Sequence, residues 1–212
     1  MNVPFWTMMV RTGWDAWGVN QTYRVDPFNG GPTWCFSRYG MSATVWKEKF
    51  VVCIGGGHED GYDPDFLIYN DVVVRDFEGN VWIYGYPAEV FPPTYCHTAT
   101  PIARYPNSNF EWDVPDEFED CIVVVGGRVY EEAGDFQQTP VYKLNLYDLS
   151  FVPFQVLGKG IGRIFAHQAA QLEPGRITVW GGELINEKGE RLPNQSRAVL
   201  DLWKREWEIV SP

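Results

Sequence analysis

Short apolar runs, rich in β-branched residues and each ending in a pair of glycines, set the pattern of this chain. They are Val51–Gly56, Ile122–Gly127 and Ile177–Gly182. Runs of this length and composition predict buried strands, and the paired glycines predict turns at places where a side chain would not fit. Because the same run recurs along the chain, the pattern predicts a repeat protein.

The segments that follow each glycine pair predict further short strands. The expected strands are 70–76, 81–84 and 96–102 after the first pair, 139–145, 151–157 and 166–170 after the second, and 197–202 and 207–210 after the third. The N-terminal stretch fits the pattern less clearly, with expected strands at 5–10, 21–26, 33–36 and 38–45. On this division the last unit ends without a fourth strand.

Helical periodicity is scarce in the chain. The best candidate, 197–207, is crowded with β-forming residues that fit strands at least as well. With 212 residues, of which 45% are hydrophobic, the chain is long enough for one substantial core, and no linker divides it. We therefore predict a single all-β domain, with units at roughly 1–49, 50–120, 121–175 and 176–212.

The repeated unit resembles the kelch repeat, in which a hydrophobic run ends in Gly-Gly, a Trp lies on the third strand and a small-residue strand often carries His. Besides the glycine pairs, the matching residues are Tyr69-Asn70, Tyr142, Trp82, Trp207, Gly40–Ala43 and His97–Ala99. The resemblance covers nearly the whole chain and implies a β-propeller with four-stranded blades. A narrower likeness to a group of bacterial kelch proteins rests on Gly57–Asp60, Asp63–Asp65, Tyr69–Val74, Tyr84–Pro87 and Phe91–Pro93, and it implies no particular activity.

Closure of such a ring is an open question, because three clear units and one less clear unit are few for a kelch propeller. An open propeller would expose a sheet edge and a blade face. The N-terminal segment could complete a small ring of about four blades, two chains could share one larger propeller as a homodimer, or another protein could cap the opening. We expect the first arrangement.

The net charge of the chain limits the classes of partner that it is expected to bind. Its 28 Asp and Glu outnumber its 17 Lys and Arg, which gives a formal net charge of −11. Contact with nucleic acid or an anionic membrane needs a basic surplus, so neither partner is expected. An acidic surface suits a basic protein partner, although the same charge also serves solubility alone.

Several further signals point to an ordinary cytoplasmic protein without a cofactor. The N-terminus does not resemble a signal peptide, and no run reaches the length of a membrane span. The four cysteines include no Cys-x-x-Cys pair, so neither a disulfide framework nor a zinc site is expected. We interpret Cys53 and Cys121 as small buried hydrophobic residues within strands.

Two of the three histidines are expected to have a structural role. His97 and His167 occupy equivalent places in successive units, where Met41 stands in the first. A catalytic imidazole has no reason to recur with the repeat, so we predict packing and hydrogen bonding between units. The glycine-rich segment 158–163 precedes a strand-like run rather than a helix, so we interpret it as a turn and not as a phosphate loop.

The third histidine begins an acidic loop. His58, Glu59 and Asp60 are candidates for a ligand site, because imidazole and carboxylates together serve ligand binding or acid–base chemistry. A solvated loop with turn-forming Asp and Pro explains the same residues.

The remaining loops favour protein binding. Loops 58–69, 86–95, 128–138 and 183–196 are expected on one face of the propeller, and 104–120 on the opposite face. The candidate contacts are Phe110, Trp112, Asp113, Asp116, Glu117 and Phe118 on the second face, with Tyr62, Asp63, Asp65, Phe66 and Phe91 on the first. Aromatic side chains among carboxylates supply affinity and steering for a basic partner. Alternatively, the aromatic side chains fold back over the blade edges.

These observations lead to three hypotheses. The first is a non-catalytic module that binds a basic protein, in its narrowest form an inhibitor or immunity-type protein. The second is a small-ligand or carbohydrate-binding propeller, or an enzyme, with a site around His58. The third is a structural subunit of a larger assembly.

Overall fold

The computed structural model describes residues 3–23, 34–59, 67–102, 118, 120–129 and 137–211. Within them the chain is an all-β protein of antiparallel sheets with two short helices, α1 (Pro4–Thr12) and α2 (Ala16–Tyr23). The all-β prediction is therefore confirmed.

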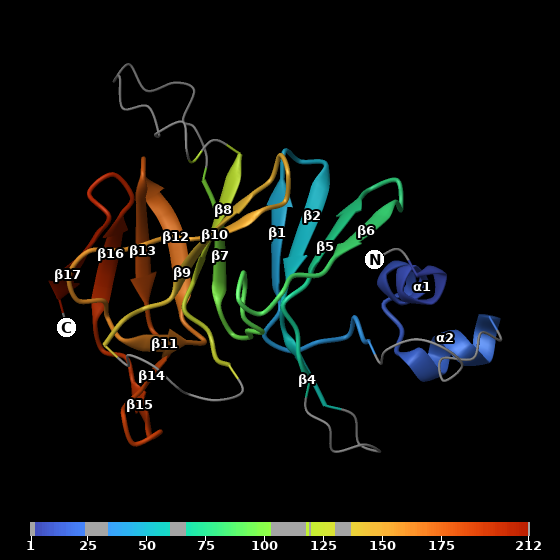
Figure 1. The fold of residues 1–212 in the computed structure, drawn as a ribbon, viewed down its shortest axis with the longest axis horizontal. Coiled ribbons are helices and arrows are strands. Elements are labelled where there is room, and N and C mark those ends of the chain that lie inside the picture. Colours follow the sequence, from blue (N-terminus) through green and yellow to red (C-terminus); the bar gives the residue numbers. More distant parts are fainter. Residues whose placement is uncertain are drawn as a thin grey trace.

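Three four-stranded sheets follow one another along the chain (Figure 1). The first sheet contains β1 (Ser42–Trp46), β2 (Phe50–Ile54), β5 (Val72–Asp76) and β6 (Val81–Tyr84). The second contains β7 (Thr98–Pro101), β8 (Cys121–Val125), β9 (Val141–Asn145) and β10 (Phe151–Pro153). The third contains β12 (Gln168–Glu173), β13 (Arg176–Trp180), β16 (Arg197–Asp201) and β17 (Glu206–Ser211).

Two smaller sheets extend beyond the glycine pairs. One is the ribbon of β3 (Gly57–His58) and β4 (Leu67–Ile68), and the other joins β11 (Arg163–Phe165), β14 (Glu183–Ile185) and β15 (Arg191–Pro193). The three glycine pairs follow the C-terminal ends of β2, β8 and β13. We call this end of the sheets the glycine edge.

The strands predicted at 38–45 and after each glycine pair exist, whereas residues 34–36 form no strand, and the grouping of the strands into units was wrong by one strand. Each segment expected to close a unit instead begins the next sheet, as β7 does at Thr98 and β12 does at Gln168. The third sheet consequently has four strands, and the unit that seemed to lack its last strand is complete.

Two hydrophobic cores lie between neighbouring sheets, and β8 serves both. Ile122 and Val124 face the first sheet, whereas Val123 and Val125 face the third. All five residues of β8 are buried, because a strand whose alternate side chains face two packed layers has no solvated side. The short apolar runs in the sequence are therefore the central strands of stacked sheets.

The N-terminal segment is helical, so the strand predicted at 5–10 was wrong; of 21–26, residues 21–23 belong to α2 and the others lie outside the described residues. Trp6, Met9 and Val10 form one buried helical face, because their spacing places them on the same side of α1. Pro4 begins this helix, and Gly13 ends it with a φ of +70°.

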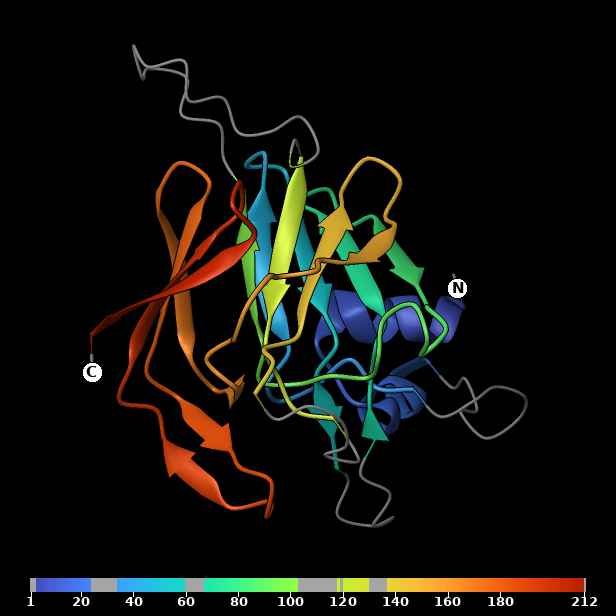
Figure 2. The same ribbon diagram turned by 60° about the vertical axis from the view of Figure 1, so that its left-hand side comes forward.

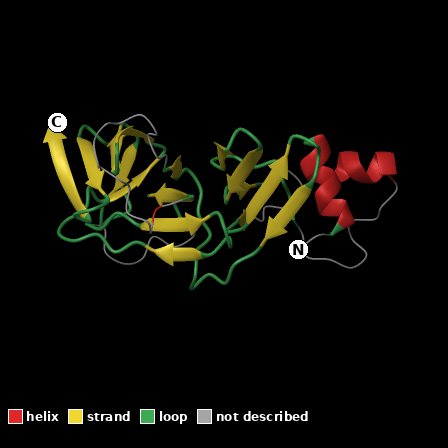
Figure 3. Cartoon of the chain, turned by 90° about the horizontal axis from the view of Figure 1, so that it is seen from above, coloured by secondary structure: helices red, strands yellow, loops and turns green. Residues whose placement is uncertain are grey.

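The helices cover the outer face of the first sheet, where Cys53, Val73 and Ile83 pack against them. Figures 2 and 3 show the helices at one end of the row of sheets and the C-terminus at the other. The expected closure of the last blade by the N-terminal segment was therefore wrong.

The glycine pairs allow neighbouring sheets to approach one another. Gly55 and Gly126 have φ values of +58° and +66°, and a Cβ on either would collide with a carbonyl oxygen of the next sheet's lead-in segment. These carbonyls belong to Thr94 and Ile164. At the third pair, Gly181 has the same φ of +66° as Gly126, but no atom of the described residues lies within 4 Å of the place of its Cβ.

This difference gives a matched test of the approach between sheets. Gly126→Ala should lower the free energy of unfolding by about 3 kcal/mol, because it adds a collision with Ile164 to the strain of a positive φ. Gly181→Ala should cost only about 1 kcal/mol, because it adds the strain alone. Urea unfolding of both variants measures the difference, and equal losses would contradict a close approach at Gly126.

Candidate functional site

The histidines of the repeat form the polar part of the contact between sheets. Ser42 lies 2.9 Å from His97 Nε2, and Thr98 lies 2.9 Å from His167 Nε2. Each contact joins the first residue of one sheet to the residue that precedes the next sheet. Both imidazoles are buried, so the prediction of packing and hydrogen bonding between units is confirmed.

Burial keeps both imidazoles neutral. Loss of solvation lowers the pKa of His97 to about 3, with a smaller contribution from His167, and lowers the pKa of His167 to about 4. Their Nδ1 atoms are buried and have no hydrogen-bond partner among the described residues, which makes protonation at this position more costly.

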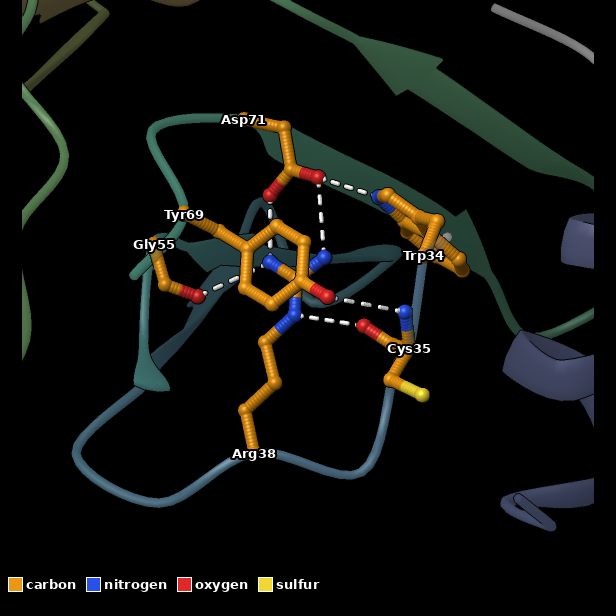
Figure 4. Close-up of polar contacts among 6 residues, drawn as sticks. All are labelled: Trp34, Cys35, Arg38, Gly55, Tyr69 and Asp71. Atoms are coloured by element: carbon orange, nitrogen blue, oxygen red, sulfur yellow. Dashed lines mark hydrogen bonds and ion pairs between the residues drawn. The ribbon is translucent and has the colours of Figure 1, made fainter. Parts of the chain in front are cut away.

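A buried ion pair lies at the glycine edge of the first sheet (Figure 4). Arg38 binds Asp71 through both of its terminal nitrogens, and their side chains are 0% and 5% exposed. Arg38 also donates to the carbonyl oxygens of Cys35 at 2.6 Å and Gly55 at 3.0 Å. We call this group the Arg38 cluster.

Two aromatic side chains complete the Arg38 cluster. The guanidinium lies 3.6 Å from the ring centre of Tyr69, and the indole of Trp34 donates to Asp71 at 2.5 Å. Burial raises the pKa of Tyr69 to about 12, so its hydroxyl stays protonated. Because Trp34 also stacks on Trp6 of α1 at 5.3 Å, the cluster connects the helices to the glycine edge.

The Arg38 cluster is structural rather than reactive. Four of the five N–H groups of the guanidinium have an acceptor in the cluster, and the counter-charge of Asp71 meets what burial of a charge requires. Sequence reasoning missed it. A signal was present in the sequence. Asp71 directly precedes three valines of a strand that is buried on both faces, so its carboxylate is expected to be buried and to need a buried cation.

The proposed ligand residues lie beside this cluster. His58 ends β3, is half-buried, and its Nδ1 is 2.8 Å from the carbonyl oxygen of Ser37. Glu59 is exposed, whereas Asp60 lies outside the described residues. Of the predicted ligand site, the structure therefore describes His58 and Glu59.

Two candidate partner contacts were wrong. Phe91 is fully buried, and its ring stacks on Phe151 at 3.9 Å. Phe118 is also fully buried and packs against Phe154 at 5.4 Å. Neither ring can contact a partner, because each fills the core beneath its loop. These two side chains instead fold back onto the sheets, which was the alternative interpretation of the aromatic residues in the loops.

The other candidate partner contacts lie outside the described residues: Tyr62, Asp63, Asp65, Phe66, Phe110, Trp112, Asp113, Asp116 and Glu117. The described ends of their loops can be placed. Segment 60–66 connects β3 to β4 at the glycine edge, and 103–117 connects β7 to β8 at the opposite edge. There Asp120 forms an exposed ion pair with Lys47 at 2.7 Å.

Other chemical sites receive little support. The segment 158–163 leads into β11, a strand, and its Ile161 amide donates to the hydroxyl of Thr139, so the turn interpretation is confirmed. A cleft of about 540 Å³ beside it is lined by Lys159, Arg163 and Lys188 among others. Within the described residues no group of three His, Cys, Asp or Glu could hold a metal ion.

Two further expectations can be compared with the structure. All four cysteines lie in the described residues, and none forms a disulfide; Cys53 and Cys121 are buried as predicted. In the described part of the chain, neither helix has the length and apolar character needed to cross a membrane.

Comparisons with known proteins give the fold alone. No protein-family model matches the chain, and no curated protein matches it. Among solved structures, the chain is similar to "Structure of YjhT", with a TM-score of 0.56 and 13% sequence identity. The match covers 89% of this chain and 54% of that one, so the chain spans about half the length of that structure.

Breaking the Arg38 cluster should destabilise the whole protein. Asp71→Asn should lower the free energy of unfolding by about 3–5 kcal/mol, because it leaves a buried guanidinium without its counter-charge. Lys47→Ala, which breaks the exposed ion pair with Asp120, should cost less than about 1 kcal/mol. Urea unfolding measures both, and a small loss for Asp71→Asn would contradict a structural role.

The neutral histidines should make the protein sensitive to acid. Their pKa values are lower in the folded state than the ordinary 6.5, so the unfolded chain binds more protons once the pH falls below about 6.5. Between pH 7.5 and pH 5 the free energy of unfolding should fall by about 2 kcal/mol per histidine. The double variant His97→Gln, His167→Gln should lose most of this slope, and an unchanged slope would assign the acid sensitivity to other groups.

Proposed function

We propose that this chain is a non-catalytic binding module with a kelch-like propeller architecture that binds a basic protein through acidic, aromatic-bearing loops. The observation that carries the proposal is the distribution of charge. Segments 60–66, 103–119 and 130–136 hold eleven of the 28 Asp and Glu but only one of the 17 Lys and Arg. Nearly all of the net charge of −11 therefore belongs to three loops, and the rest of the chain is almost balanced.

Such a concentration of charge suits recognition better than solubility. Charge spread over the surface would keep the protein soluble equally well, whereas charge gathered in loops steers a cationic partner toward them. The same loops carry Tyr62, Phe66, Phe110 and Trp112, and buried aromatic side chains supply much of the binding energy at protein interfaces.

The scaffold supports this role because it fixes the ends of the loops. The Arg38 cluster and the β3–β4 ribbon hold one loop at the glycine edge, and the buried Phe118 anchors the end of another at the opposite edge. Binding loops on a rigid sheet framework are a common arrangement in proteins. Three successive four-stranded antiparallel sheets support the kelch-like interpretation, in which each sheet is a blade.

A second candidate function, a ligand site around His58, has one observation in its favour. The contact of His58 Nδ1 with the Ser37 carbonyl orients the imidazole, as a functional histidine requires. The two functions predict opposite results from matched pairs of substitutions, one in each loop.

The test compares Trp112→Ala, Glu117→Gln with His58→Ala, Glu59→Gln. Proteins captured from the native source on the unaltered chain would be identified, purified and titrated against both variants at low and high salt. The first variant should weaken binding at least about tenfold and reduce its dependence on salt, whereas the second should change it less than about twofold. The reverse result would favour the ligand site, and no effect from either variant would refute both functions.

A further inference from the structure

The first two sheets have equivalent residues at the glycine edge. The amide of Gly55 donates to the carbonyl oxygen of Asp71 at 3.0 Å, and the amide of Gly126 donates to the carbonyl oxygen of Pro140 at 2.8 Å. Each acceptor directly precedes the third strand of its sheet, which is β5 in the first sheet and β9 in the second. Pro140 therefore stands in the second sheet where Asp71 stands in the first.

The cation that binds Asp71 also has an equivalent. A Cβ on Gly56 would lie 3.0 Å from the Cβ of Arg38, and a Cβ on Gly127 would collide with Oγ1 of Thr94. Arg38 and Thr94 each stand four positions before the start of the first strand of their sheet. The second sheet therefore has a short hydroxyl side chain where the first sheet has the guanidinium that Figure 4 shows.

A cavity of about 240 Å³ lies at this place in the second sheet. Thr94, Pro140 and the glycine pair line it, so it corresponds to the space that the ion pair of the Arg38 cluster fills in the first sheet. The rest of its apolar wall comes from Phe91, Pro92 and Val129. Because Phe91 is fully buried, the core beneath it holds this wall in place.

The cavity also has a polar part, which consists of Arg163, Tyr142 and Thr94. Arg163 begins β11 and is the only charged residue among the described residues that line the cavity. Within the described residues, the hydroxyls of Tyr142 and Thr94 form no hydrogen bond. A guanidinium has five N–H donors, so Arg163 can hold a ligand in addition to its contacts within the protein.

The hydroxyl of Tyr142 is a fixed donor at neutral pH. Burial raises the pKa of Tyr142, and the positive charge of Arg163 offsets only part of this rise, so the hydroxyl stays protonated. The ring lies edge-on against Phe91, with 5.2 Å between the ring centres. Its packing keeps the hydroxyl in one place, as a binding site requires.

We propose that this cavity binds a small monocarboxylic acid with an apolar body. The carboxylate would take the part that Asp71 has in the first sheet, with Arg163 as its cation and the two hydroxyls as further donors. The apolar body would lie against the wall that includes Phe91. Such a ligand site goes beyond the protein partner proposed above and does not depend on it.

Charge, shape and size select this class of ligand. One cation in the cavity matches one negative charge, whereas a phosphate monoester carries nearly two at neutral pH. The planar carboxylate fits a guanidinium with two parallel hydrogen bonds. A cavity of about 240 Å³ is smaller than the sites of drug-sized ligands, so the apolar body is limited to about one ring.

The experiment titrates the full chain with benzoate at neutral pH. Benzoate should bind with a Kd of about 1 mM or lower, and the amide signals of Gly127 and Val129 should shift in the same titration because both residues line the cavity. Benzamide, which has the same shape without the charge, should bind at least about tenfold more weakly. Absence of benzoate binding, or equal binding of benzamide, would overturn the proposal.

Three variants locate the binding site. Arg163→Gln should weaken benzoate binding at least about tenfold, and Tyr142→Phe, which keeps the ring and its packing, at least about threefold. The matched control is Arg191→Gln on β15, because Arg191 lies across β14 from Arg163 in the same small sheet but does not line the cavity. It should change the affinity less than about twofold.

The variants also give the results that would contradict the site. Unchanged benzoate affinity in both Arg163→Gln and Tyr142→Phe would overturn the proposal. Equal losses in Arg163→Gln and Arg191→Gln would show attraction to surface charge alone and would overturn it as well. Because Tyr142→Phe removes only a hydroxyl, it decides the question even where Arg163→Gln alters the fold.

Discussion

The close approach of neighbouring sheets at the glycine pairs is the constraint on which the structure depends. A backbone carbonyl of one sheet occupies the place where the preceding sheet would otherwise carry a Cβ, and an imidazole lies against the same glycine. Only a residue without a side chain permits this contact at a positive φ. The close spacing allows β8 to bury its residues toward both neighbours, and from this the two cores between the sheets follow.

The sequence predicted the strands well because their signal is local. Val123, Val124 and Val125 are β-branched, lie next to one another and precede two glycines, so a few residues are enough to identify a buried strand. The grouping into sheets could not be predicted as well, because it depends on which neighbour accepts a strand. The segment at 96–102 is closer in sequence to β6 than to β8, and only the three-dimensional packing assigns it to β8.

The helices and the Arg38 cluster were missed for different physical reasons. Thr7, Met8 and Val10 fit a strand by composition, but Trp6, Met9 and Val10 share a helical face that covers the first sheet. Tertiary packing thus overrides local propensity. Arg38 and Asp71 are separated by 33 residues, and no local pattern pairs them. For the candidate site, the strand ends that the acidic loops connect could be predicted, whereas the burial of Phe91 and Phe118 required the core beneath them to be known.

The helices cover the outer face of the first sheet, so the two ends of the row of sheets differ. A stack of similar sheets with two open ends would add copies of itself without limit, as repeat proteins that lack terminal caps can do. Here α1 and α2 close one end, so growth by addition of like units stops at the first sheet. Copies of this chain therefore cannot extend the row by stacking head to tail, because the outer face of the first sheet is already covered.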